Sequence, residues 1–233
     1  MALKDDITKL VNSYFTGKYE IKNTTIVPST DYSKLTFGNT GLVCDLAFLF
    51  VDIRKSSDMH TVYGFEKTAR IYQSFHAICL YIIESKDGHI RAFDGDRIMG
   101  VFSGSSKRTN AVKAAMHIRW AIDELLNPKL TGKPLKIGCG VEAGDTLITK
   151  VGKANDIDCR DLVWIGKACN YAAHLTQYAY NTIIISADVY SKMNESVKYT
   201  DSTQATNMWN YKKLKLKNGK EINVYESTYR WGL

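Results

Sequence analysis

Proline is scarce in this chain. The 233 residues include three prolines, Pro28, Pro128 and Pro134. No stretch is rich enough in proline, glycine or serine to indicate a linker between two domains. We therefore expect one domain over residues 41–233, preceded by an N-terminal helical extension over residues 1–40.

Long apolar runs are missing as well. The run over residues 46–51 is one of the longest, and it is far short of the roughly 20 residues that a membrane-spanning helix needs. The first six residues also lack the apolar core of a signal peptide. We therefore expect a cytoplasmic protein without a membrane span.

The cysteines do not follow a metal-binding or disulfide pattern. They are Cys44, Cys79, Cys139, Cys159 and Cys169. Their odd number and the lack of C-x-x-C spacing argue against a disulfide framework and a zinc site. We expect reduced thiols, most of them in apolar surroundings.

Acidic residues are fewer than basic ones, so the formal net charge is +7. This excess favours an anionic partner without identifying it. A nucleic-acid surface usually has basic residues interleaved with aromatics, whereas the one concentrated basic run, residues 212–220, alternates Lys with Leu. That alternation indicates an edge strand followed by a turn at Asn218 and Gly219. No nucleic-acid partner is expected.

Apolar periodicity predicts an α+β protein. We expect helices over residues 4–15, 60–85, 108–126, 166–178 and 187–193. We expect strands over residues 46–53, 89–93, 97–102 and 182–186, a paired 136–142 and 146–151, and a closing hairpin over 213–226. Residues 162–165 are expected to form a short segment that leads into the helix over 166–178. The order strand-helix-strand-strand-helix-strand resembles a ferredoxin-like, split βαβ core, with a mostly antiparallel central sheet flanked by helices.

Two aspartates border apolar runs of strand length. Asp52 follows residues 46–51, and Asp96 precedes residues 98–102. Neighbouring strands would bring the two carboxylates together, and such a pair can hold divalent cations for phosphoryl transfer. The alternative is that Asp52 ends a strand and that residues 94–96 form an ordinary Asp-Gly turn.

Four segments resemble class III nucleotide cyclases, the family of adenylate and guanylate cyclase catalytic domains. They are residues 50–57, 95–102, 138–144 and 165–175, in the family's order and with compatible spacing. One such motif is weak, but four in register are specific. The resemblance covers roughly residues 44 to 228 and implies that residues 41–233 form the catalytic domain.

The resemblance implies a metal-dependent active site. Asp52 and Asp96 would bind two divalent ions, Mg²⁺ or Mn²⁺, with the main chain of Ile53 beside them. The main chain of Ile53, Arg54, Lys55 and Ser56 would bind the phosphates of a nucleoside triphosphate, helped by the following helix N-terminus.

Three further residues stand at catalytic positions of the family, and two of them match it. The family has an Asn, four residues before an Arg, on one helix face. Asn170 matches the Asn, but His174 stands at the Arg position, and a His is fully charged only when protonated. Either His174 is held cationic, or another base such as Arg54, Arg91, Arg97 or Lys153 replaces it, or the enzyme is weakened. Lys217 matches the family's phosphate-binding Lys.

The residues that read purines in this family are missing. Ala92 and Val163 stand at these two positions, and neither side chain can form a hydrogen bond. Arg91 and Lys167 are candidate readers of a smaller base. The freestanding chain resembles the bacterial pyrimidine cyclases of Pycsar anti-phage systems, which make cyclic UMP (cUMP) or cyclic CMP (cCMP) to trigger an effector. UTP is favoured, and CTP is the alternative.

The family resemblance also implies a homodimer with two composite sites. Asp52 and Asp96 of one subunit would face Asn170 and Lys217 of the other. The sequence leaves open two alternatives to a pyrimidine cyclase. One is an adenylate or guanylate cyclase whose base readers lie elsewhere, and the other is a degenerate cyclase domain that binds nucleotide and regulates a partner.

Overall fold

The fold is known from a computed structural model that describes residues 3–154, 156–201, 203, 205–217 and 219–233. Its helices are α1 (Leu3–Phe15), α2 (Met59–Glu84), α3 (Lys107–Ala121), α4 (Lys167–Tyr178) and α5 (Ala187–Lys192). Its strands are β1 (Glu20–Asn23), β2 (Thr40–Ile53), β3 (Gly88–Asp94), β4 (Arg97–Phe102), β5 (Ile137–Ala154), β6 (Ile157–Ile165), β7 (Ile183–Ser186), β8 (Asn210–Lys215) and β9 (Glu221–Ser227). Helices and strands alternate along the chain, as the apolar periodicity predicts.

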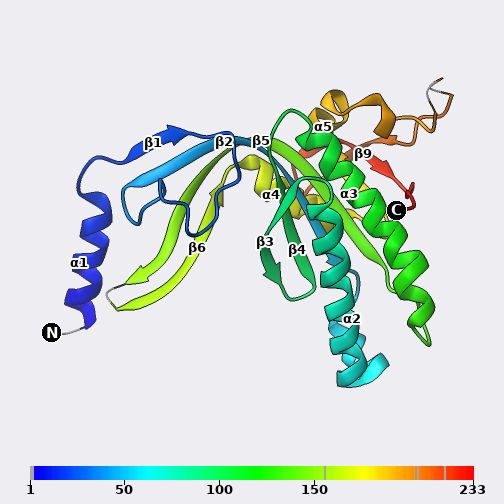
Figure 1. Cartoon of the computed structure of the whole chain (residues 1–233), viewed down its shortest axis with the longest axis horizontal. Helices are drawn as coiled ribbons and strands as arrows, with labels where there is room; N and C mark the ends of the chain where they lie inside the picture. The colour runs from blue at the N-terminus through cyan, green and yellow to red at the C-terminus, as the bar shows by residue number, and fades with distance from the viewer. Residues whose placement is uncertain (1–2, 155, 202, 204, 218) are drawn as a thin grey trace.

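One mixed sheet organises the molecule (Figure 1). Its strand order is β3-β4-β2-β5-β7-β9-β8, while β1 pairs with β2 and β6 with β5. The β1–β2 and β5–β7 pairs are parallel, and the other pairs are antiparallel. The order β3-β4-β2-β5 is that of a split βαβ unit, which confirms the predicted ferredoxin-like, mostly antiparallel α+β fold.

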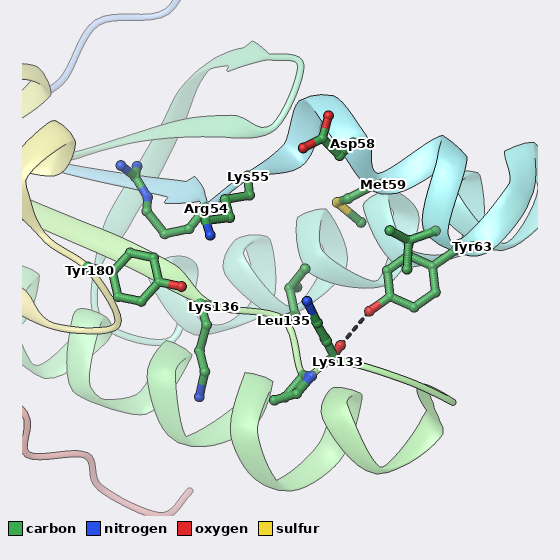
Figure 2. Close-up of a pocket in the computed structure, with 11 residues that line it drawn as sticks. Arg54, Lys55, Asp58, Met59, Tyr63, Lys133, Leu135, Lys136 and Tyr180 are labelled. Carbon is green, nitrogen blue, oxygen red and sulfur yellow. Dashed lines mark hydrogen bonds between the residues drawn. The ribbon is translucent and has the colours of Figure 1, made fainter.

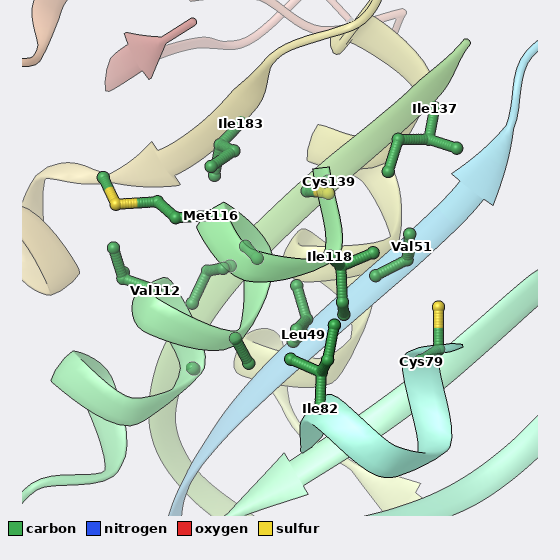
Figure 3. Close-up of a cluster of buried hydrophobic side chains, with 14 of the residues drawn as sticks. Leu49, Val51, Cys79, Ile82, Val112, Met116, Ile118, Ile137, Cys139 and Ile183 are labelled. Atoms are coloured by element: carbon green, nitrogen blue, oxygen red, sulfur yellow. The ribbon is translucent and has the colours of Figure 1, made fainter. Parts of the chain in front are cut away.

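Strand β2 separates two apolar layers because its side chains alternate between the faces of the sheet. Leu49 and Val51 pack into a core with side chains of α2 and α3 (Figure 3). Phe48 and Phe50 face the other side, in a cluster that includes Ala172 of α4. Alternation therefore places Asp52 on the α4 side of the sheet.

The predicted pairing of residues 136–142 with 146–151 is wrong. Both segments belong to the continuous strand β5, which pairs with β2 from Gly41↔Thr149 to Ile53↔Ile137. Residues 143–145 resemble a turn locally, but the long neighbouring strand keeps their backbone extended. The hairpin partner of this end of β5 is β6, which is longer than the predicted segment 162–165.

The two ends of the chain follow the prediction in outline. Helix α1 forms as expected, but none of its residues is buried. Strand β1 was not expected and pairs with β2 from Glu20↔Thr40 to Asn23↔Val43. The closing hairpin is β8–β9; Asn218 of its predicted turn, like Met1 and Ala2, lies outside the described residues. In the described ranges, no helix combines the length and the hydropathy needed to cross a bilayer.

Helix α4 lies directly on the backbone of β5, because Gly138 and Gly140 have no side chain. A Cβ at Gly140 would lie 2.3 Å from the Ala172 carbonyl oxygen and 2.7 Å from the Thr176 nitrogen. Both are main-chain atoms of α4, so the helix itself would have to move.

We therefore expect Gly140→Ala to lower the free energy of unfolding by about 3 kcal/mol. The matched control is Gly41→Ala in β2, where the three atoms nearest to an added Cβ belong to the side chains of Leu147 and Tyr19. Side chains can shift more easily than a helix backbone. Urea unfolding of both variants measures the difference. Equal losses would contradict the close packing of α4 on β5.

Candidate active site

The fold brings Asp52 and Asp96 together, as predicted. Asp52 is the second-to-last residue of β2 and pairs with Arg97 of β4, and Asp96 lies in the turn that precedes β4. The Ile53 amide donates a hydrogen bond to the Asp96 carbonyl oxygen at 3.1 Å. This bond holds the β3–β4 turn against the end of β2, so both carboxylates occupy one edge of the sheet.

The Asp52 carboxylate is electrostatically strained. Burial raises its pKa to about 6, the Arg54 guanidinium opposes this shift, and the Asp96 carboxylate adds to it. Arg54 donates a hydrogen bond to Asp52 within an ion pair whose two side chains are 14% and 21% exposed. Arg97 also opposes the shift, but the pKa of Asp52 stays raised with both guanidinium groups nearby. A bound cation would therefore stabilise the ionised pair of carboxylates further.

The donor set fits a hard divalent cation. Mg²⁺ typically binds one or two carboxylates together with water and substrate phosphate oxygens, which matches Asp52 and Asp96. Within the described ranges, no group of three or more His, Cys, Asp or Glu side chains could hold a metal by itself. Substrate oxygens would therefore complete the coordination, and the Ile53 carbonyl stays a predicted main-chain ligand.

Cation binding to the free protein should depend on pH through Asp52. Its folded pKa of about 6 lies above the ordinary 3.8, so the folded state binds this proton more tightly than the unfolded chain. The ionised group therefore costs stability as the pH rises from about 4 to above 6, and a bound cation offsets that cost.

We expect Mn²⁺ to raise the melting temperature more at about pH 7.5 than at about pH 5, because protons compete for Asp52 at the lower pH. Asp52→Asn should lose this pH dependence. Thermal unfolding with and without Mn²⁺ measures both. An equal Mn²⁺ effect at the two pH values in the wild-type protein would contradict the assignment.

The segment after Asp52 offers fewer free amides than the resemblance implies. The Ile53 amide is bonded to Asp96, and the Arg54 amide donates to the Lys136 carbonyl oxygen at 2.8 Å. Lys55 adopts a left-handed conformation with φ 59°, and Ser56 begins a short 3-10 helix over Ser56–Asp58. The predicted phosphate contacts of the main chain therefore rest on Lys55 and Ser56.

The residues predicted to lie near the base occupy different surroundings. Ala92 of β3 is partly buried against the Phe48 and Phe50 cluster, whereas Val163 of β6 is 41% exposed. Arg91 donates to the carbonyl oxygens of Pro28 at 3.0 Å and Ile90 at 2.9 Å. Its guanidinium thus ties β3 to the N-terminal segment, and base reading by Arg91 stays a prediction that requires these bonds to be exchanged.

The residues predicted to act from the second subunit lie on the exposed surface. Asn170 and His174 are exposed and one turn apart on α4, and Lys217 is exposed in the β8–β9 connection. The Lys217 amide donates a hydrogen bond to the Tyr178 hydroxyl of α4 at 3.0 Å. This bond holds the β8–β9 connection against α4. Among the described contacts, none joins these three residues to Asp52 or Asp96.

Tyr72 is a neighbour of the carboxylates that periodicity did not single out. The sequence places it on the apolar face of a helix, and it is partly buried against the α2–α3 core. Burial raises its pKa, with further contributions from Asp96 and Asp52, while a hydrogen bond with Ser56 opposes the shift. Its spacing is that of a core residue, so the sequence carried no signal that sets Tyr72 apart as a neighbour of the carboxylates.

Similarity to known proteins covers the whole chain. No family model matches the sequence. The chain is 34% identical over 238 residues to a uridylate cyclase from Burkholderia cepacia, and the match covers 99% of both proteins. It is 33% identical over 237 residues to a uridylate cyclase from Xanthomonas perforans, again covering 99% of both.

Solved structures share the fold at lower identity. The adenylyl cyclase CyaB from P. aeruginosa matches with a TM-score of 0.67 and 20% identity, over 80% of this chain and 95% of that chain. The guanylate cyclase domain of RhGC from Catenaria anguillulae, in complex with GTP, matches with a TM-score of 0.64 and 16% identity, over 80% of this chain and 96% of that chain. Because its near-full-length relatives at 33–34% identity are uridylate cyclases, the chain belongs to the uridylate cyclase family and is a nucleotide cyclase.

Proposed function

We propose that this enzyme converts a pyrimidine nucleoside triphosphate to the 3′,5′-cyclic monophosphate and pyrophosphate. UTP is the favoured substrate and CTP the alternative. The observation that carries the reaction is the pair of carboxylates, Asp52 and Asp96, held together at one sheet edge. The two near-full-length relatives named uridylate cyclase support the choice of UTP.

The chain's own residues bind and orient the triphosphate. Two Mg²⁺ or Mn²⁺ ions, held by Asp52, Asp96 and the Ile53 carbonyl, would lower the pKa of the ribose 3′-hydroxyl and neutralise phosphate charge. The main chain at Lys55 and Ser56 would fix the phosphates. Positioning and charge neutralisation are the main requirements of such an intramolecular displacement.

We further propose a homodimer with shared sites. Asn170, His174 and Lys217 are exposed and without a described contact to the carboxylate pair, as expected for groups that act on a neighbouring subunit's substrate. Asn170 and Lys217 would orient the ribose and the phosphates. His174 stands at the position of the family's Arg and would face the same substrate.

The absence of purine readers supports pyrimidine selectivity. Ala92 and Val163 carry no hydrogen-bonding group, and a site that leaves the polar edges of a purine unpaired binds it poorly. By resemblance to the Pycsar cyclases, the cyclic nucleotide would act as a second messenger in anti-phage defence, through a downstream effector that binds cyclic nucleotides.

Turnover with each of the four ribonucleoside triphosphates in the presence of Mn²⁺ tests the proposal. We expect cyclic UMP and pyrophosphate from UTP as the dominant products. Dominant turnover of ATP or GTP would contradict pyrimidine selectivity and favour a purine cyclase with relocated base readers. Nucleotide binding without pyrophosphate release would favour a second candidate, a regulatory nucleotide-binding domain, which the replacement of the family's Arg by His174 makes worth testing.

A further inference from the structure

Helix α1 carries an apolar stripe that its own chain leaves uncovered. Leu3, Ile7 and Val11 repeat at helical spacing, and Tyr14 and Phe15 continue the row. Each of these residues is between 45% and 87% exposed, and no residue of α1 belongs to a described apolar cluster. A free helix of 13 residues is marginal in water. The stripe therefore needs a surface to pack on.

Figure 1 shows α1 beside the ribbon of β5 and β6, where one face of the sheet is also uncovered. The Tyr14 hydroxyl ties α1 to this region by donating to the Lys153 carbonyl oxygen of β5 at 3.1 Å. Residues that pair across neighbouring strands share a face, and successive residues alternate. One face of β1, β2, β5 and β6 thus carries the outer apolar face, which consists of Ile21, Val43, Leu147, Val151 and Ile165. Ile21, Val151 and Ile165 are 56%, 37% and 49% exposed.

The opposite face of the same strands is covered. Leu42, Ile148 and Trp164 lie there, buried in the cluster that also contains Phe48 and Ala172 of α4. Helix α4 therefore lies across the sheet from the outer apolar face. A contact on this face and a contact through α4 can exist in one assembly.

The outer apolar face is also separated along β2 from the candidate active site. Val43 lies near the start of this strand, whereas Asp52 lies near its end. A cavity lined by Lys55, Lys133 and Lys136 adjoins the Asp52 end (Figure 2) and belongs with the candidate active site. Neither α1 nor the outer apolar face shares a residue with these groups.

The charges of α1 argue against a lipid bilayer as the missing surface. Helices that lie on membranes usually carry a polar face rich in Lys and Arg. In α1, Asp5 and Asp6 balance Lys4 and Lys9. A protein surface is therefore the better match for the stripe.

The exposed area fits a second copy of the chain. At roughly 200 Å² for a large apolar residue, the stripe and the exposed part of the outer apolar face present on the order of 900 Å² per chain. Each partner in a stable interface buries roughly 800 Å². Because each chain offers one helix stripe and one sheet face, two copies related by a twofold axis can cover both pairs at once. Such a reciprocal contact removes both apolar faces from water.

We propose that two copies of this chain exchange α1, with the apolar stripe of each copy docked on the outer apolar face of the other. Helix α1 is then an assembly element that lies outside the candidate active site. The inference goes beyond the proposed function, because it holds whichever triphosphate the enzyme cyclises.

Charging the stripe tests this contact in the full-length protein. Ile7→Glu with Val11→Glu places two carboxylates in the interface. The control, Lys9→Gln with Asn12→Glu, lowers the net charge by the same amount on the polar face of α1. Sedimentation equilibrium over a series of protein concentrations is the readout. We expect the concentration of half-dissociation to rise about tenfold or more in the stripe variant and less than about twofold in the control.

A wild-type protein that sediments like the stripe variant at every concentration overturns the inference. A second outcome against it is stripe-dependent binding to vesicles of phosphatidylcholine and phosphatidylglycerol with unchanged assembly, which would assign the stripe to a membrane surface. Thermal unfolding checks that the rest of the fold is intact, as expected because α1 has no buried residue.

Cross-linking identifies the docking surface. Chains with Val11→Cys are mixed with chains with Ile165→Cys, both in a Cys159→Ser background that removes the exposed native thiol. A short bismaleimide should join the two kinds of chain, whereas Asn12→Cys in place of Val11→Cys should give little product. Cross-linking only within a chain that carries both Val11→Cys and Ile165→Cys would show that α1 folds back on its own sheet, and it would overturn the exchange.

Discussion

Asp52→Asn should reduce kcat for cyclisation by about a thousandfold or more. The change keeps the shape of the side chain and removes the charge that we propose binds a divalent cation. Asp96→Asn should have a comparable effect, because the two carboxylates share one site at the ends of β2 and the β3–β4 turn.

Asp94→Asn is the matched control for this experiment. Asp94 belongs to the same turn, but its side chain is 71% exposed and paired with Arg97. We expect less than about a threefold change in kcat, because an exposed ion pair contributes little. Pyrophosphate release measures activity, and thermal unfolding checks that each variant is folded. Full activity of folded Asp52→Asn would rule out its proposed role.

Mixing two inactive variants should restore activity if the sites are shared between subunits. Asp52→Ala and Asn170→Ala each damage every site of their own homodimer. In a heterodimer, one site combines the intact Asp52 of one chain with the intact Asn170 of the other. After random exchange, half of the dimers carry one intact site, so about a quarter of wild-type activity should return.

The control mixture is Asp52→Ala with Asp96→Ala. Both residues belong to the same half of the site, so no pairing restores an intact one, and activity should stay at the level of the single variants. Recovery in this control would show that the sites are not divided as proposed. Lack of recovery with Asp52→Ala and Asn170→Ala, once heterodimers are detected, would indicate that each chain is self-sufficient.

Much of the fold follows from local sequence patterns. Apolar periodicity predicts α2 and α4 almost at their observed bounds, because helical spacing over several turns is a strong signal. Turn chemistry places the β3–β4 hairpin around residues 94–96. The same reasoning misjudged residues 143–145, since a turn-like composition does not reveal that β2 pairs along the whole of β5.

The candidate site also contains residues that the sequence predicts and residues that only the folded chain reveals. Asp52 and Asp96 are recognisable because each borders a strand-length apolar run, and the fold brings them together. Tyr72 has the spacing of a core residue, and its approach to the carboxylates depends on how α2 lies on the sheet. Arg91 is predicted as a base reader, yet the folded chain directs its guanidinium to the Pro28 carbonyl.

The sequence by itself determined the family, the two aspartates at strand ends and the apolar side chains of Ala92 and Val163, because these depend on residue identity and short-range spacing. The tertiary structure decided which side chains share a space. It gathered Lys55, Lys133 and Lys136 around one cavity and left Asn170 and His174 exposed on α4. The physical reason is that strand pairing and helix packing join segments far apart in the chain, and no local pattern records which long-range contacts a segment will make.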